Sequence, residues 1–410
     1  MYEKIVEVSQ QFLKIKNSPY KRYLIRKNKF THRMSMILGQ RGVGKTTTLV
    51  QLLLQETEGD RFDPRILYVQ ADHFALGKTS LYEIAEKFQM LGGKWLAIDE
   101  IHKYPNWSNE LKSIYDTFTH LKLYVSGSSA LQIYKGSHDL IRRSTSYLMQ
   151  GSSFREYLEL MHGLQLPSFT LEEICQNHNK IADSIIDILE KNNLKVIPEF
   201  NKYLKIGYYP YYFEINDDDA FKITLEQSFH MTIESDLAAI YPHLAGSSEK
   251  KIKQLLMFIA ASAPFTPNWQ KIMQILEIGD VRTLKSYFSH LQDACLIQSI
   301  SKTSSKMSKL ESPEKVYLDN TNQLYAIASK DPEKGTLRET YFLTMLSQNH
   351  DVTLPLDGDF LIDELYLFEV GGRNKNFTQV KSHPNSFLAL DDMELGIGNK
   401  IPLWLFGFLY

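Results

Sequence analysis

Residues 39–46 have the types and spacing of a phosphate-binding loop. Read in order they are Gly-Gln-Arg-Gly-Val-Gly-Lys-Thr, which matches the pattern G-x-x-x-x-G-K-[ST]. Glycines let backbone N–H groups turn toward phosphate oxygens, and a following helix adds positive potential. Lys45 can reach the β- and γ-phosphates, and the Thr46 hydroxyl can bind Mg²⁺. We therefore expect ATP and Mg²⁺ as cofactors. The residues expected to bind the nucleotide are Gly39, Gln40, Arg41, Gly42, Val43, Gly44, Lys45, Thr46 and Thr47.

Two adjacent acids, Asp99 and Glu100, follow the apolar run Trp95–Ile98. Adjacent side chains at the end of a strand point in different directions. Asp99 can therefore hold the Mg²⁺ shell while Glu100 polarises a water for attack on the γ-phosphate. The alternative is an ordinary acidic turn after a strand. The phosphate-binding loop upstream favours the catalytic interpretation.

Two serines and two arginines extend the set of catalytic candidates. Ser126 and Ser128 follow an apolar run and could touch the γ-phosphate or the attacking water, or they could simply cap the next helix. Arg142 and Arg143 could supply an arginine finger, in trans if the protein forms a homo-oligomer. The alternative for both arginines is a solvated basic turn, and the sequence leaves the two interpretations open.

A parallel sheet is needed to bring these residues together. Apolar runs predict strands at Met34–Leu38, Ile66–Gln70, Trp95–Ile98, Leu121–Ser126 and Ser144–Met149. Helical runs lie near Leu49–Gln55, Ser80–Gln89, Asn106–Phe118 and Ala130–Tyr134. Strands that alternate with helices predict an α/β fold with helices on both faces of a parallel sheet. Ligands of such sheets bind beyond the carboxyl ends of the strands, which is where the polar motifs fall.

The motifs together resemble prokaryotic AAA+ superfamily ATPases of the archaeal-ATPase type. The resemblance rests on the phosphate-binding loop, on Asp99 and Glu100 with Ile101–Trp107 behind them, on Ser126–Ser129, and on Ser153–Leu158. It implies a P-loop NTPase sheet of the additional-strand type with the order 5-1-4-3-2. It also implies that the chain then passes into a helical region.

Length and composition bound the organisation of the chain. A chain of 410 residues is too long for one core, and we expect domains at 1–150, 151–248, 249–318 and 319–410. The net charge of −2 identifies no partner, and two cysteines without metal-ligand spacing favour a reducing compartment. The first residues lack a signal-peptide core, and the apolar run Ile401–Tyr410 is too short to span a bilayer. We expect a cytoplasmic protein without a membrane partner, and Ile401–Tyr410 as a buried last strand.

The third predicted domain has the pattern of a winged helix. Helices are expected at Lys251–Ala261, Trp269–Leu276 and Val281–Ala294, and wing strands at Leu296–Ile300 and Lys315–Leu318 around the Ser/Lys-rich Ser301–Leu310. Eight Lys and one Arg against three acids give residues 250–309 a charge of 9 − 3 = +6. Arg282 and Lys285 are the candidates for contacts with duplex DNA. The alternative is a module that binds a protein partner.

A second basic stretch, Lys14–Arg33, could help to hold nucleic acid. It could equally be a solvated face beside the phosphate-binding loop.

The last predicted domain carries acids that resemble those of a PD-(D/E)xK nuclease fold. Under that resemblance Glu339, Asp359 and Glu369 are the acidic positions and form a possible second metal site. The pattern requires a lysine at residue 371, where the chain has Gly371. Substitutes could come from Arg373, Lys375 or Lys381, but no spacing requires it. We expect a nuclease-like fold with little or no cleavage.

These observations predict an Mg²⁺-dependent ATPase whose hydrolysis drives conformational change in DNA-associated carboxyl-terminal domains. A nucleotide-dependent protein-interaction switch with slow hydrolysis is the first alternative. An ATP-regulated DNA nuclease is the second.

Overall fold

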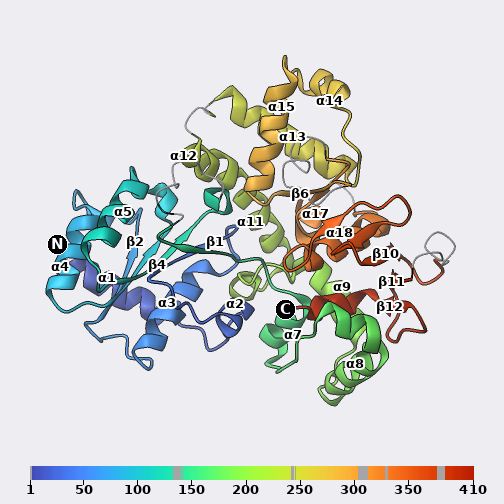
Figure 1. Cartoon of the computed structure of the whole chain (residues 1–410), viewed down its shortest axis with the longest axis horizontal. Helices are drawn as coiled ribbons and strands as arrows, with labels where there is room; N and C mark the ends of the chain where they lie inside the picture. Colours follow the sequence, from blue (N-terminus) through green and yellow to red (C-terminus); the bar gives the residue numbers. More distant parts are fainter. Residues whose placement is uncertain are drawn as a thin grey trace. The chain divides into compact units, whose positions relative to one another are not determined.

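The residues expected to bind phosphate lie at one edge of a parallel sheet in the computed structural model (Figure 1). The structure describes residues 2–132, 140, 142–241, 244, 246–302, 313–327, 331–375 and 384–410. The chain divides into two units. Unit 1 comprises Met1–Gly151 and Met231–Ala245, and unit 2 comprises Ser152–His230 and Gly246–Tyr410. A short segment from the middle of the sequence therefore belongs to the unit that carries the phosphate-binding loop.

The sheet of unit 1 has five strands, all parallel, in the order β2-β3-β4-β1-β5. They are β1 (Met34–Leu38), β2 (Ile66–Gln70), β3 (Trp95–Asp99), β4 (Lys122–Gly127) and β5 (Thr145–Leu148). β1 and the carboxyl-terminal parts of β3 and β4 are buried, as expected for strands covered on both faces. The predicted fold class and strand order are confirmed, and each strand lies within one residue of its predicted bounds.

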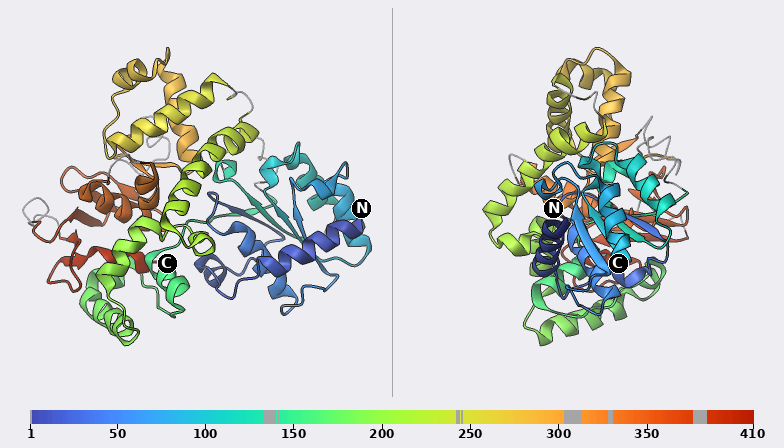
Figure 2. Two further views of the ribbon diagram at one scale, coloured as in Figure 1. Left: turned by 180° about the vertical axis from the view of Figure 1, so that it is seen from behind. Right: turned by 90° about the vertical axis from the view of Figure 1, so that its left-hand side faces the viewer.

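Helices cover both faces of this sheet. They are α1 (Tyr2–Ile15), α2 (Tyr23–Lys27), α3 (Lys45–Glu56), α4 (Leu81–Met90) and α5 (Trp107–Thr117), with short helices η1 (Phe74–Leu76), η2 (Ile101–Lys103) and η3 (Ser129–Gln132). α1 packs beside β2, and α3 packs beside β3 and β4 (Figure 2). Right-handed crossovers place α4 and α5 on the opposite face. The helix predicted at Ala130–Tyr134 is present as η3, and residues 133 and 134 lie outside the described residues.

The later segment of unit 1 is helical and joins two helices of unit 2. It contains the π-helix η5 (Thr232–Leu237) and α12 (Ala238–Ile240). α12 packs against η2, the short helix that follows the acidic end of β3. The sequence offered no local pattern that assigns this segment to the first unit.

Unit 2 begins with helices and continues with three helices and a two-stranded sheet. The helices are α7 (Phe154–His162), α8 (Leu171–Lys191), α9 (Val196–Ile206), α10 (Tyr212–Ile215), α11 (Asp218–Met231), α13 (Ser247–Ser262), α14 (Trp269–Leu276), α15 (Val281–Asp293), α17 (Thr321–Ile327) and α18 (Lys334–Leu346). β6 (Ile297–Ile300) and β7 (Lys315–Leu318) pair antiparallel after α15. The helices and strands predicted between residues 251 and 318 are present, and most of the loop between the two strands, residues 303–312, lies outside the described residues.

A second sheet of five strands completes unit 2 in the order β12-β11-β10-β9-β8. The strands are β8 (Val352–Thr353), β9 (Phe360–Ile362), β10 (Tyr366–Gly371), β11 (Ser386–Leu390) and β12 (Lys400–Pro402). α18 packs on β10 through Phe342, whose ring lies 5.1 Å from that of Phe368 and 5.2 Å from that of Phe360. Aromatic packing of this kind fixes the helix over the central strands.

The last ten residues differ from the prediction. Only Lys400–Pro402 forms a strand, and Leu403–Phe408 forms the 3₁₀ helix η8. Every residue of η8 is buried, so its apolar run has no periodicity that distinguishes a strand from a helix. The predicted burial is correct and the predicted strand is wrong. Of the helices among the described residues, none combines the length and apolarity needed to cross a bilayer.

Candidate nucleotide site

The glycine-rich loop between β1 and α3 has a backbone that side chains would obstruct. Gly42 and Gly44 adopt left-handed conformations with φ of 81° and 101°, which glycine tolerates without strain. A Cβ atom on Gly39 would lie 2.4 Å from the carbonyl oxygen of Met149, so only glycine fits there. The loop ends where α3 begins at Lys45. The predicted loop therefore stands between a buried strand and a helix of 12 residues, as phosphate binding requires.

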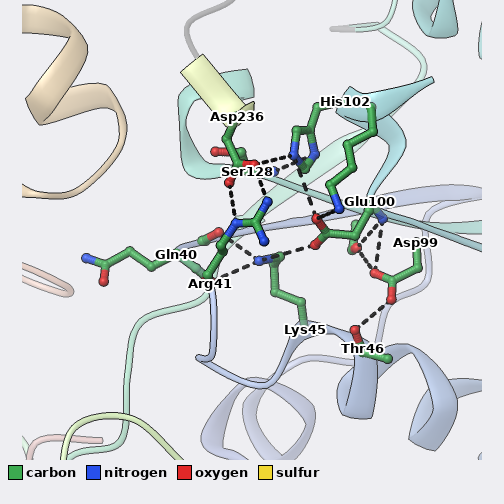
Figure 3. Close-up of polar contacts among 12 residues, drawn as sticks. Gln40, Arg41, Lys45, Thr46, Asp99, Glu100, His102, Ser128 and Asp236 are labelled. Carbon is green, nitrogen blue, oxygen red and sulfur yellow. Dashed lines mark hydrogen bonds and ion pairs between the residues drawn. The ribbon is translucent and has the colours of Figure 1, made fainter. Parts of the chain in front are cut away.

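Lys45 is buried and held by the loop that precedes it. Its Nζ donates to the carbonyl oxygens of Gly39 and Gln40, each at 2.9 Å. The same nitrogen lies 3.9 Å from Oε1 of Glu100 (Figure 3). Both hydrogen bonds go to neutral carbonyl groups, so they orient the ammonium group without neutralising it.

The Asp99 carboxylate lies at the end of β3 and accepts hydrogen bonds on both oxygens. Oδ2 accepts from the hydroxyls of Thr46 and Tyr68, each at 2.6 Å. Oδ1 accepts from the backbone N–H of Glu100 at 3.1 Å and from the hydroxyl of Ser126. Burial, followed by the nearby Asp99 charge, raises the pKa of Tyr68, which therefore stays a hydrogen-bond donor.

Thr46 and Asp99 suit a divalent cation. Mg²⁺ prefers oxygen ligands and is commonly held by one or two protein oxygens together with waters and phosphate oxygens. The Thr46 hydroxyl and the Asp99 carboxylate are such ligands and lie side by side. These two residues would hold Mg²⁺ beside a bound nucleotide.

Glu100 is ionised and partly enclosed. Its backbone is left-handed, with φ of 54°, and this turn separates its side chain from that of Asp99. Burial alone would raise the pKa of Glu100, but electrostatic interactions with Lys45, His102 and Lys103 lower it below its ordinary value. The group is therefore a carboxylate at neutral pH and can accept a proton from water.

Asp236, which no sequence motif indicates, completes this cluster. Asp236 of η5 accepts two hydrogen bonds from Arg41, at 3.0 Å from Nε and 2.6 Å from Nη2. Its Oδ1 also lies 3.4 Å from Nε2 of His102, which in turn lies 3.7 Å from Glu100 Oε2. Figure 3 shows Asp236, His102 and Glu100 gathered around Arg41 and Lys45. No motif surrounds Asp236 in the sequence, whereas His102 stood within the Ile101–Trp107 stretch.

The two candidate serines contribute in different ways. The Ser126 hydroxyl is bound to Asp99 and also accepts from the N–H of Glu100 at 3.1 Å. Ser128 donates its backbone N–H to Nδ1 of His102 at 3.3 Å. Both serines therefore lie at the acidic end of the sheet.

The two candidate arginines do not lie at this site. Arg142 is exposed, and Arg143 makes two contacts of 2.8 Å with Asp116 near the end of α5. Both precede β5, so they lie at the amino edge of the parallel sheet, whereas the phosphate-binding loop lies at the carboxyl edge. Neither arginine therefore lies at the nucleotide site of its own chain, and a finger role in trans in a homo-oligomer stays a prediction.

A buried arginine supports the loop from the amino-terminal basic stretch. Arg22 donates to the carbonyl of Val43 at 2.6 Å, and to those of Gln150 and Gly151 at 2.9 and 2.8 Å. It is 5% exposed, so it is neither part of a solvated face nor open to nucleic acid. The sequence showed a run of basic residues but did not distinguish the buried one from the rest.

Arg282 and Lys285 lie on the first turns of α15. Arg282 is exposed, and Lys285 is half-buried with its ammonium 5.3 Å from the centre of the Trp269 ring. Asp280 caps the helix by accepting from the N–H of Arg282 at 3.2 Å. Both cations are on one short stretch of a helix whose other side packs into the unit through Leu284.

The three predicted acids lie near one another, and two of them, Glu339 and Glu369, are paired with lysines. Glu339 accepts from Nζ of Lys315 at 2.6 Å and from the hydroxyl of Tyr317 at 2.8 Å. The β9–β10 register continues so that Asp359 stands opposite Glu369. Among the described residues no group of three or more His, Cys, Asp or Glu side chains is placed to hold a metal ion. The three acids therefore do not form the carboxylate metal site that the resemblance implied.

Lys375 occupies the place that Gly371 leaves empty. Its Nζ lies 2.8 Å from Oε1 of Glu369, whose side chain is 1% exposed. A Cβ atom on Gly371 would lie 2.9 Å from the Cβ, Cγ and Cδ atoms of Lys375. Burial opposes the charge of Lys375, but the hydrogen bond that Lys375 donates to Glu369 and the charges of the surrounding acids raise its pKa. Of the other substitutes considered, Lys381 lies outside the described residues.

The amino-terminal region is similar to a known domain family. Residues 31–158 match the family model described as AAA domain. This region contains every residue of the nucleotide cluster except Asp236. Residues 197–334 match a second model, described as a domain of unknown function (DUF8612).

One protein relative is similar over part of the chain. An uncharacterized protein of Methanocaldococcus jannaschii is 32% identical over 193 residues, which are 45% of this chain and 39% of that protein. The chain therefore matches well under half of the length of that relative.

Solved structures show weaker likenesses. Domain III of the Thermotoga maritima replication initiation protein DnaA is 17% identical, covering 47% of this chain and 89% of that chain, with a TM-score of 0.25. The S. cerevisiae Hsp104–ADP complex is 13% identical, covering 72% and 39%, with a TM-score of 0.26. C. elegans PCH-2 is 11% identical, covering 43% and 49%, with a TM-score of 0.24. Likenesses at these scores carry no functional conclusion.

Proposed function

We propose that unit 1 binds ATP with Mg²⁺ and hydrolyses it. The observation that carries the proposal is the Lys45 ammonium, which is buried, held by two loop carbonyls and placed beside the ionised Glu100. A triphosphate is the ligand whose charge and shape suit a glycine loop, a helix amino end and this lysine together. The match of residues 31–158 to the AAA domain model supports the same assignment.

The residues of the cluster divide the work of hydrolysis. Bound Mg²⁺ would supply positive charge to the β- and γ-phosphates, held by Thr46 and Asp99. Glu100 would orient the attacking water and accept its proton, since its lowered pKa keeps it ionised. Ser126 holds Asp99 and the N–H of Glu100 together, which keeps the two acids in their separate orientations.

The experiment that tests the proposal measures ATP turnover beside ATP affinity. Wild-type protein should bind ATP by calorimetry and release phosphate, and Glu100→Gln should bind but release little. The mass of the protein in each nucleotide state, measured by light scattering, shows whether a homo-oligomer forms. A wild-type protein that binds no ATP at any Mg²⁺ concentration would contradict the proposal.

We propose duplex DNA as the client of unit 2, through a winged-helix module at residues 249–318. Arg282 is exposed at the start of α15, and Lys285 lies one turn further on. Cations at the start of a helix after a capped turn can contact phosphates of a duplex groove. Turnover measured with and without duplex DNA distinguishes this client from a protein partner, because only the DNA client predicts stimulation by the polymer.

The alternative function of the region at 319–410 is cleavage of a phosphodiester. Lys375 supplies a cation beside Glu369, but the described acids are not placed to hold a metal ion, so we expect little or no nicking. The pattern requires a lysine at residue 371, where the chain has Gly371. The side chain of Lys375 passes beside Gly371 and contacts Glu369. Such a lysine could orient a water and offset charge that develops on the phosphate. A plasmid nicking assay with Mg²⁺ and with Mn²⁺ tests this function in wild type, Glu369→Ala and Lys375→Ala. Nicking that only the wild type shows would support it, and no nicking by the wild type would exclude it under these conditions.

A further inference from the structure

Asp236 reaches the nucleotide cluster from a part of the chain far from any of its motifs. It lies 195 residues beyond Arg41, on the π-helix of the segment Met231–Ala245. Both neighbours of that segment in the sequence, α11 and α13, belong largely to unit 2. The segment that carries Asp236 is therefore joined by the backbone to unit 2 at both of its ends.

The contact of Asp236 with Arg41 is strong and enclosed. The carboxylate side chain is 3% exposed and the guanidinium side chain is 27% exposed. Two parallel N–H···O bonds of 3.0 and 2.6 Å set the orientation as well as the position of the guanidinium group. Arg41 is itself a residue of the phosphate-binding loop, so its side chain is fixed beside the place that phosphate would occupy.

Asp236 also lies close to His102, which in turn lies close to Glu100. Nδ1 of His102 accepts from the N–H of Ser128, so in the neutral ring the proton must be on Nε2. That nitrogen faces Oδ1 of Asp236 at 3.4 Å and Oε2 of Glu100 at 3.7 Å. Asp236 thus contacts two residues at the expected position of the γ-phosphate. One is Arg41 of the phosphate-binding loop, and the other is His102, which lies beside the expected general base Glu100.

We infer that Asp236 is a positioning residue for hydrolysis, which holds Arg41 and His102 so that Glu100 faces the γ-phosphate. The inference rests on the proposed ATPase function. Asp236 carries a negative charge near the triphosphate, so it does not help ATP to bind. Removing that charge frees Arg41 for the phosphates while it releases His102 and Glu100. Hydrolysis should therefore fall although binding does not weaken.

The test compares kcat with ATP affinity in Asp236→Asn, which keeps the size of the side chain. We expect kcat to fall about 10-fold or more, as for loss of a group that orients a general base. The dissociation constant of a non-hydrolysable ATP analogue should stay equal or become smaller. A collapsed site would instead weaken binding and turnover together, so the split between the two is the readout.

A second variant and a control keep the test decisive. His102→Gln should show the same split, and the Asp236→Asn/His102→Gln double variant should be no slower than the slower single variant, because both act through Glu100. Glu56→Gln is the control. Glu56 accepts from Lys122 and Tyr124 at 3.0 and 2.7 Å in the same unit, away from the loop, and its loss should leave kcat unchanged.

The outcomes separate the inference from the proposed function. A wild type that hydrolyses ATP, with unchanged kcat in both Asp236→Asn and His102→Gln, overturns the inference alone. Parallel losses of binding and kcat in both variants overturn it as well. A wild type that neither binds nor hydrolyses ATP overturns the inference together with the ATPase proposal.

Discussion

Both units contain buried or half-buried acids beside a sheet, but the partners of these acids differ. In unit 1, Asp99 is held by hydroxyl groups and a backbone N–H, and the nearby Lys45 is held by carbonyls. In unit 2, Glu369 and Glu339 are each bound directly by a lysine, at 2.8 and 2.6 Å. Neutral partners leave the charge of an ionised group available to a ligand, whereas direct ion pairs neutralise it within the protein.

The difference explains why one region is a better candidate for an anionic ligand. In unit 1, Lys45 and the glycine-rich loop can bind phosphate directly. The ion pair of Lys45 with Oε1 of Glu100 is long, at 3.9 Å, so phosphate does not have to displace a close carboxylate. A ligand of the unit 2 acids must compete with lysines that already lie on them. One feature of unit 2 favours a ligand there: Oε2 of Glu369 is buried and has no hydrogen-bond partner among the described residues.

The contrast between the two units requires that Lys45 be needed for ATP binding. Lys45→Ala should weaken ATP binding by about 10²- to 10⁴-fold, since two charge-assisted contacts contribute roughly 1.5–3 kcal/mol each. Calorimetry of the folded variant measures the change. Lys94→Ala, which removes an exposed lysine just before β3, should bind like the wild type. Unchanged affinity in Lys45→Ala would mean that the loop does not bind phosphate.

Glu100→Gln separates binding from chemistry at the same sheet edge. Turnover should fall by roughly 10²-fold or more because the amide cannot accept the proton of water. ATP affinity should persist, since Glu100 carries no phosphate-binding charge. The lowered pKa of Glu100 also predicts that protonation of Glu100 itself does not limit wild-type kcat until the pH is below the ordinary pKa of a glutamate. Near wild-type hydrolysis in Glu100→Gln would transfer the role to another acid.

Lys375→Ala tests whether unit 2 uses its lysine for stability. Removal leaves Glu369 buried without its cation, which costs about 1–2 kcal/mol once the 39% exposure of Lys375 is taken into account. Glu369→Gln in the same chain should recover most of that loss. Urea unfolding followed by circular dichroism measures both variants, with Lys202→Ala of α9 as an exposed control. No difference between Lys375→Ala and the control would show that the pair contributes nothing measurable.

The smallest expected effect concerns the two cations on the first turns of α15. Replacing Arg282 and Lys285 with Ala should weaken duplex DNA binding and reduce the slope of log affinity against log salt by about two units. Fluorescence anisotropy over a salt series measures the slope. Lys180 and Lys191 of α8, both exposed, provide a matched pair of control substitutions. Absence of DNA binding by the wild type at low salt would favour a protein partner for unit 2.

Most of the nucleotide cluster could be predicted because it comes from two short segments, each with its own sequence pattern. Residues 39–46 join a strand to a helix, and Asp99 and Glu100 end the next but one strand along the chain. In a parallel sheet the carboxyl ends of strands meet at one edge, so local spacing is enough to bring such residues together. The same rule shows why Arg143 lies away from the cluster of its own chain: it precedes β5 and therefore lies beyond the amino ends of the strands.

The sequence by itself determined the sheet, the phosphate-binding loop and the acids at its edge, because each depends on a short periodic pattern. Only the tertiary structure decided that Asp236 joins Arg41, that Arg22 is buried under the loop, and that Lys375 fills the space over Gly371. These three contacts have no shared periodicity or spacing. They depend on how distant segments pack, which is a property of the whole core and not of any stretch of the chain.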